Sequence, residues 1–145
     1  LSFGTAALIG YANYSRILGL LLETGVPLPA ASEVASKSVR NTILARGLTG
    51  IDAALREGRP LSAQLSVCPK VPEVLFRIAS LGEQSGKLGK ALVDAAGILE
   101  RKAQTRTDRL LAALTPGITI LLGLIVALVV GALFLGIASL TDIQI

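Results

Sequence analysis

The amino-acid sequence predicts an all-α fold, namely a compact antiparallel bundle of about six helices followed by one C-terminal transmembrane helix. Apolar residues recur every three or four positions, and no stretch alternates long enough to indicate a strand. Aromatic residues form only 3% of the chain, so the core has to be built from Leu, Ile, Val and Ala, which suits closely packed helices. All 14 Lys and Arg residues lie before Ala112, which leaves an apolar C-terminal part.

The first helix is predicted over Tyr11–Thr24, with an apolar segment, residues 1–10, leading into it. That leading segment is too short to cross a bilayer. Gly25 is expected to cap the helix at its C-terminus, and Pro27 to prevent its continuation. A second helix follows over Pro29–Val39, where a proline in the first turn leaves no hydrogen bond unmade.

The remaining helices are predicted from apolar spacing and from glycine and proline stops. A third helix over Asn41–Arg56 places Leu44, Leu48, Ile51 and Leu55 on one face. The next elements are a short helix capped by Ser62 and ending at Leu65, a helix over Pro72–Leu81, a break over Gly82–Gly86, and a long helix from Lys87. Residues 11–109 are thus expected to form one helical domain.

No charged residue occurs between Leu110 and Thr141. A helix of that length exceeds the hydrocarbon thickness of a bilayer, about 30 Å. Since Pro116 and Gly117 lie near its start, we expect residues 110–141 to comprise an approach and a span over about Ile118–Leu140. Residues 142–145 would then form a short tail beyond the membrane.

Basic residues set the predicted orientation. None of them follows the span, and the six nearest before it are Lys87, Lys90, Arg101, Lys102, Arg106 and Arg109. The positive-inside rule therefore predicts a cytoplasmic bundle and a periplasmic C-terminal tail. The net charge of +4 fits this topology and anionic membrane lipid. No basic patch interleaved with aromatic residues supports nucleic-acid binding.

Small residues recur every four positions along the span, at Thr119, Gly123, Ala127 and Gly131. Such a stripe lets a second helix approach closely in lipid. We therefore expect the stripe to pack against another membrane helix. No ionisable residue lies at membrane depth in the span, which argues against a proton or ion pathway there.

The residues of an enzyme active site are missing. The chain has no His, and its single Cys68 is expected to be a small buried side chain. The segment Gly82-Glu83-Gln84-Ser85-Gly86-Lys87-Leu88 is too short for a phosphate-binding P-loop and lacks the hydroxyl after the lysine. The carboxylates are dispersed, and pairs such as Glu33 with Lys37, or Glu83 with Lys87, are spaced as on a solvated helix face. We expect no catalysis, no metal and no cofactor.

The order of motifs resembles the repeated domain of the type II secretion F family. The segments that carry the resemblance are Leu18–Leu28, with its Gly-Val-Pro-Leu turn, Glu57–Ser62, with its Leu-Ser pair, the proline pair Pro69 and Pro72, and Gly82–Leu88. The last one matches a family pattern Gly-Glu-x-Ser-Gly-x-Leu. The chain departs from the family at Thr115-Pro116, where a Glu-Pro is frequent, and at Gly136, in place of a proline.

The resemblance implies an inner-membrane platform protein of type II secretion or type IV pilus assembly, multi-pass when full length, with no catalytic activity. This chain would be its second cytoplasmic repeat and its last membrane helix. The implied partners are a cytoplasmic assembly ATPase, other inner-membrane subunits, pilin or pseudopilin subunits, and further copies of the protein itself. A transporter subunit and a tail-anchored adaptor unrelated to secretion are the alternatives.

Two interpretations of the Gly-Glu-x-Ser-Gly segment stay open at this point. Glu83 and Lys87 could contact a partner. Alternatively, the segment could be a structural turn, in which Gly86 takes a positive φ and Ser85 caps the helix that follows.

Overall fold

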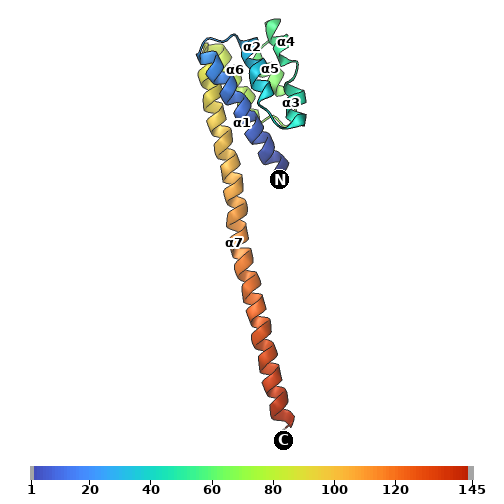
Figure 1. Cartoon of the computed structure of the whole chain (residues 1–145). Coiled ribbons are helices and arrows are strands. Elements are labelled where there is room, and N and C mark those ends of the chain that lie inside the picture. The colour runs from blue at the N-terminus through green and yellow to red at the C-terminus, as the bar shows by residue number, and fades with distance from the viewer. Residues whose placement is uncertain (1, 144–145) are drawn as a thin grey trace. The chain divides into compact units, whose positions relative to one another are not determined.

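The computed structural model describes residues 2–143, and within them it contains seven α-helices and no strand, as predicted. The helices are α1 (Ser2–Glu23), α2 (Leu28–Lys37), α3 (Thr42–Leu48), α4 (Ile51–Arg56), α5 (Leu61–Ser66), α6 (Glu73–Ser85) and α7 (Leu88–Ile143). They are labelled in Figure 1. The chain divides into two units, residues 1–106 and residues 107–145. The first contains α1–α6 and the beginning of α7, and the second contains the rest of α7.

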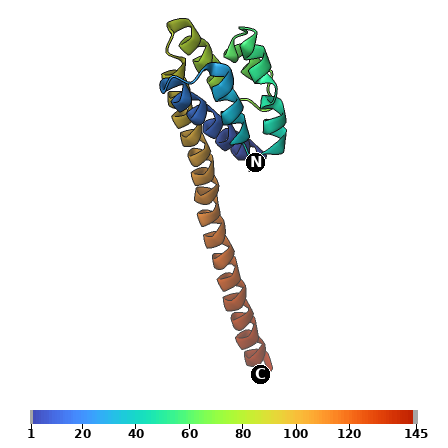
Figure 2. The same cartoon turned by 45° about the horizontal axis from the view of Figure 1, so that its top comes forward.

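The core of the first unit is built around α1. Tyr11, Tyr14 and Leu18 of this helix are fully buried, together with leucines from α3, α5, α6 and the beginning of α7. In both views α2 and the beginning of α7 lie beside α1 (Figures 1 and 2). Each fully buried Leu stabilises the fold by about 2 kcal/mol relative to an exposed one. The two tyrosine hydroxyls are satisfied inside this core, because Tyr11 donates to the carbonyl oxygen of Pro69 and Tyr14 lies 2.9 Å from the Ser32 hydroxyl.

Helix α1 begins at Ser2, so the prediction that residues 1–10 only lead into a helix starting at Tyr11 is wrong for its described part. Ala7 and Leu8 continue the apolar face and are buried. Gly10 does not end the helix, and instead allows another part of the bundle to pack closely against α1. A Cβ added there would lie 2.7 Å from the Leu44 Cδ1 atom.

The predicted third helix is two helices, α3 and α4, which meet at Thr49 and Gly50. Gly50 has a φ of 91°, which ends the helical path. The four apolar residues that predicted one helix are nevertheless all buried. Asn41 caps α3 as an N-cap should, since its Oδ1 accepts the backbone N–H of Ile43 at 3.0 Å.

Helices α1 and α7 approach each other backbone to backbone at a pair of glycines. A Cβ on Gly19 would lie 2.6 Å from the Gly89 carbonyl oxygen and 2.8 Å from the Val93 Cγ2 atom. The same two helices are joined by an ion pair between Arg16 and Glu100. The guanidinium of Arg16, which hydrogen-bonds the Glu100 carboxylate, lowers the pKa of that carboxyl.

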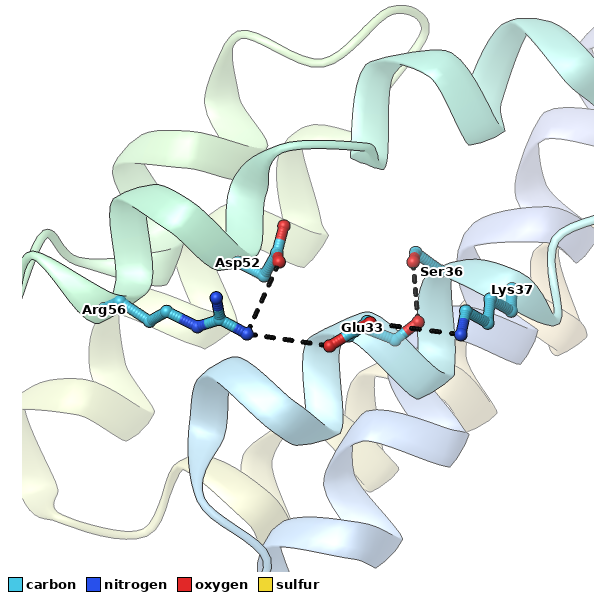
Figure 3. Close-up of polar contacts among 5 residues, drawn as sticks. All are labelled: Glu33, Ser36, Lys37, Asp52 and Arg56. Atoms are coloured by element: carbon cyan, nitrogen blue, oxygen red, sulfur yellow. Dashed lines mark hydrogen bonds and ion pairs between the residues drawn. The ribbon is translucent and has the colours of Figure 1, made fainter.

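A small charged cluster joins α2 and α4 at the surface (Figure 3). The Arg56 Nη2 atom lies 3.7 Å from the Glu33 Oε2 atom and 3.9 Å from the Asp52 Oδ2 atom. Lys37 lies 3.9 Å from Glu33, which confirms the predicted pair on α2. Exposed ion pairs of this kind contribute less than about 1 kcal/mol each. The two helices are therefore held mainly by their buried apolar faces.

In the second unit, α7 continues through Pro116 without interruption. Every described side chain from Thr107 to Thr141 is exposed within this chain. The most apolar window of 18 residues has a mean hydropathy of 3.0. Helix α7 is therefore long and apolar enough to cross a membrane, and the unit boundary falls three residues before Leu110, where the charge-free run begins.

Candidate functional site

The Gly-Glu-x-Ser-Gly segment begins inside a helix. Helix α6 runs to Ser85, so the predicted break starting at Gly82 is wrong. Gly82 is buried because α7 packs against it, and a Cβ at this position would lie 2.7 Å from the Ala91 Cβ atom. The absence of a side chain at Gly82 thus permits the close turn from α6 to α7.

The helix ends at Gly86, which has a φ of 71°. That conformation is favourable for glycine and costly for residues with a Cβ atom. The backbone N–H of Lys87 then donates to the Gly82 carbonyl oxygen at 3.0 Å, which satisfies an end group of α6. The positive φ predicted for Gly86 is confirmed. The predicted capping of the next helix by Ser85 is wrong, because the Ser85 hydroxyl donates back to the Gly82 carbonyl oxygen at 3.3 Å.

The carboxylate of Glu83 is engaged with the beginning of α5. Its Oε1 atom accepts the backbone N–H of Ser62 at 2.9 Å, and its Oε2 atom accepts the Ser62 hydroxyl at 2.7 Å. The residue before α5 is Pro60, whose side chain cannot accept a hydrogen bond, so Glu83 supplies the acceptor that an N-cap residue normally provides. A negative charge at a helix N-terminus is also favoured by the helix dipole.

Two motifs of the sequence therefore form one structural unit, which we call the α5–α6 clamp: Ser62 of the Leu-Ser pair and Glu83 of the Gly-Glu-x-Ser-Gly segment. The prediction that Ser62 caps its helix is wrong, because Pro60 occupies the N-cap position of α5 and the Ser62 hydroxyl donates to Glu83. The two residues are 21 positions apart, and neither helical periodicity nor turn chemistry connects positions at that separation.

The predicted pairing of Glu83 with Lys87 is not present, because α6 ends between them. Lys87 is exposed and forms no ion pair with any residue in the described part of the chain. It lines an open cleft of about 500 Å³ between α6 and the beginning of α7, together with the apolar side chains of Ile78 and Leu81. Contact of Glu83 or Lys87 with a partner protein stays a prediction.

The predicted turn after α1 has the expected geometry. Gly25 has a φ of 94°, its N–H donates to Leu22 at 3.1 Å, and the N–H of Val26 donates to Leu21 at 3.0 Å. These two bonds satisfy the last carbonyls of the helix. Pro27 then occupies the N-cap position of α2, with a ψ of 145° that no helix could continue.

The stripe of small residues on α7 has no packing partner among the residues that the structure describes. Gly123 and Gly131 would accept a Cβ with no atom of the described residues within 4 Å. Thr119 and Ala127 are exposed in the same way. The Thr119 hydroxyl donates to the Thr115 carbonyl oxygen of its own helix at 3.1 Å. The stripe remains a predicted contact surface.

No arrangement suited to catalysis is present among the described residues, and no group of three or more His, Cys, Asp or Glu side chains there could hold a metal ion. Cys68 is buried, as predicted. Its Sγ atom lies 3.5 Å from the Gly47 carbonyl oxygen and 3.4 Å from that of Gln64. Burial raises the pKa of this thiol to about 11, so it is a protonated packing residue at neutral pH.

Comparison with known proteins gives the family. Residues 14–136 match the family described as "Type II secretion system (T2SS), protein F". The chain is 34% identical over 131 residues to a type II secretion system protein F of Xanthomonas campestris, covering 90% of this chain and 32% of that protein. It is 30% identical over 125 residues to the type IV pilus assembly protein PilC of Thermus thermophilus, covering 86% of this chain and 31% of that one.

The chain thus spans about a third of the length of the curated relatives it matches. Proteins of this family are platform proteins of the bacterial inner membrane with no known catalytic activity, and α7 supplies a helix suited to that location. The predicted resemblance is confirmed, and this chain belongs to the type II secretion system protein F family.

Proposed function

We propose that this chain is part of an inner-membrane platform subunit of a type II secretion system, which couples a cytoplasmic assembly ATPase to pseudopilin assembly and protein export. The observation that supports this most is the division of labour in the chain. The bundle buries its own apolar side chains, whereas the apolar part of α7 exposes every described side chain. Together with the family match, this favours a scaffold that holds other subunits over a protein that performs chemistry.

The proposed partners follow from the two surfaces that the chain leaves open. The cleft between α6 and α7, with Leu81 and Lys87, is a surface for the ATPase or another cytoplasmic subunit. The stripe containing Gly123 and Gly131 is a surface for a membrane helix, from a further copy of the protein, another inner-membrane subunit or a pseudopilin. We propose no nucleic-acid partner.

The proposed topology places the bundle in the cytoplasm and residues 142–145 in the periplasm, because the basic residues all precede the span. A reporter that is active only after export, fused at Ile145 of the full-length protein, should be active. A reporter that is active only in the cytoplasm should be silent at the same position. The opposite pair of results would reverse the orientation.

The second candidate function is the platform of a type IV pilus assembly machine. It is favoured by the Thermus thermophilus relative and by a Pseudomonas putida relative, a type 4 fimbrial assembly protein PilC, 30% identical over 94% of this chain. Deletion of the full-length gene separates the two. Loss of protein export with intact pili would support the secretion system, and loss of pili with intact export would support pilus assembly. A transporter subunit or an unrelated adaptor has no support from the family.

A further inference from the structure

A second cleft, of about 540 Å³, lies in the first unit between α1, the beginning of α6 and residues 102–106 of α7. Its charged lining consists of four cations, Lys70, Arg77, Lys102 and Arg106, and a single carboxylate, Glu73. Two of these cations, Lys102 and Arg106, also support the predicted membrane topology, but their spacing in the sequence does not connect them with Lys70 or Arg77. We call this group the basic cleft.

Most of the positive charge in the basic cleft is uncompensated. Arg77 is paired with Glu73 on the same helix. Lys70, Lys102 and Arg106 form no ion pair with any residue in the described part of the chain. Cations gathered in a concave surface of this kind repel one another and concentrate anions from solution. The cleft is therefore electrostatically suited to an anionic ligand.

The local backbone brings two of these cations into the cleft. The Arg106 guanidinium packs against Gly4, since a Cβ at this glycine would lie 2.9 Å from the guanidinium Nη1 atom. Lys70 has a φ of 56° and is the only described residue other than glycine with a positive φ. It follows Pro69, whose carbonyl oxygen is held by the Tyr11 hydroxyl. A positive φ costs a residue with a Cβ atom about 1 kcal/mol or more, and the surrounding packing sustains it here.

The basic cleft is also close along the chain to the membrane segment. Only three residues separate Arg106 from Leu110, where the charge-free run begins. The charge-free run begins with the approach to the predicted span, so the cleft belongs to the part of the chain next to the membrane, where clustered basic residues are attracted to the anionic cytoplasmic leaflet.

We propose that the basic cleft binds the phosphate of an anionic phospholipid headgroup at the cytoplasmic surface of the membrane. Guanidinium and ammonium groups are suited to this ligand, because they donate charge-assisted hydrogen bonds to phosphate oxygens. The lipid would anchor the bundle against the membrane at the point where α7 leaves it. This inference rests on the proposed cytoplasmic side of the bundle, and not on any role in secretion.

The test is a binding titration of the whole chain in an uncharged detergent, with detergent-solubilised phosphatidylglycerol, phosphatidylcholine and inorganic phosphate as three separate probes. The cleft variant is Lys102→Gln with Arg106→Gln. The control variant, Arg40→Gln with Arg46→Gln, removes the same charge from exposed residues outside the cleft. Circular dichroism melting of each variant establishes that the bundle is folded.

The wild-type chain and the control should bind phosphatidylglycerol more tightly than phosphatidylcholine. The cleft variant should lose about 30-fold in affinity for phosphatidylglycerol, at about fivefold for each cation removed. An equal loss in the control, or no loss in the cleft variant, would overturn the site. Binding of inorganic phosphate without any preference for phosphatidylglycerol would overturn the lipid as its source. Because the titration needs no secretion machinery, its failure is distinguishable from failure of the proposed function.

Discussion

Leucine and glycine have opposite environments in the bundle and in the apolar part of α7. In the bundle, leucines such as Leu92 and Leu99 are fully buried, and glycines such as Gly19 and Gly82 allow helices to touch. In residues 107–141 all described leucines are exposed, and Gly123 and Gly131 have no atom near them. The bundle buries its apolar side chains within itself, whereas no described residue of the chain covers the apolar helix.

The largest expected effect comes from making one substitution in both regions. Gly19→Leu should destabilise the bundle by about 3 kcal/mol or more, because its Cβ would meet the backbone of Gly89 at 2.6 Å, a contact that no side-chain movement relieves. Gly123→Leu should change the melting of the bundle by less than about 0.5 kcal/mol, because nothing lies within 4 Å of that position. Thermal or urea unfolding of the whole chain in detergent measures both.

Substitution of the membrane glycines should have little effect on the stability of the bundle but a large effect on assembly. In cells, Gly123→Leu and Gly131→Leu should impair secretion or pilus assembly with the protein still inserted and folded, because a Leu on the stripe holds neighbouring helices apart. Leu128→Ala, at an exposed position outside the stripe, is the control. Wild-type assembly in both glycine variants would mean that the stripe is a chance of composition.

Substitutions in the α5–α6 clamp should have a smaller effect, which is on the stability of the bundle. Ser62→Ala and Glu83→Gln should each destabilise the fold by about 1–3 kcal/mol, since the hydrogen bonds are charge-assisted and half-buried. The double variant should cost clearly less than the sum, because both changes disrupt the hydrogen bond between the Ser62 hydroxyl and the Glu83 carboxylate. If Glu83 also contacts a partner, Glu83→Gln should impair assembly more than Ser62→Ala does at matched stability. Full additivity in the double-mutant cycle would contradict the clamp.

The helices were predictable from the sequence because apolar spacing is a local signal, and leucines that carried it, such as Leu18, Leu44 and Leu48, are fully buried in the structure. The glycines were harder to interpret. Gly25 and Gly86 end helices, as predicted, and have a positive φ. Gly10 and Gly82 lie within helices because another element packs against them. Local sequence does not distinguish the two uses, since the deciding neighbour lies elsewhere in the chain.

The contacts that fix the candidate site could not be predicted from local sequence either. Glu83 meets Ser62 across 21 positions, and Arg16 meets Glu100 across 84. The basic cleft combines three separate segments of the chain. The membrane stripe, in contrast, was fully specified by spacing on one helix, because a periodic pattern needs no tertiary information.

The smallest expected effect is a dependence on pH from the pair that joins α1 and α7. The hydrogen bond from Arg16 lowers the pKa of Glu100 in the folded chain. The stabilisation is therefore complete above the pKa of an unfolded Glu, about 4.3, and is lost as the pH falls through the lower folded value. Both side chains are about 40% exposed, so the loss should be less than about 1 kcal/mol.

Unfolding of the wild-type chain and of Glu100→Gln, followed from pH 7 to pH 3, measures this contribution. The difference in stability between the two should shrink as the solution becomes acidic. A difference that grows toward low pH would show that the pair does not stabilise the bundle through the ionised carboxylate.

The measurement that tests the contrast between the two regions most directly is cysteine crosslinking in native membranes. In a Cys68→Ala background of the full-length protein, Gly123→Cys and Gly131→Cys should form oxidative crosslinks to a neighbouring subunit. Ile125→Cys, about 200° around the helix from Gly123, should face lipid and remain uncrosslinked. Crosslinking from Ile125→Cys alone, or none from either stripe position, would contradict the account that this face of α7 is where the platform holds its partners.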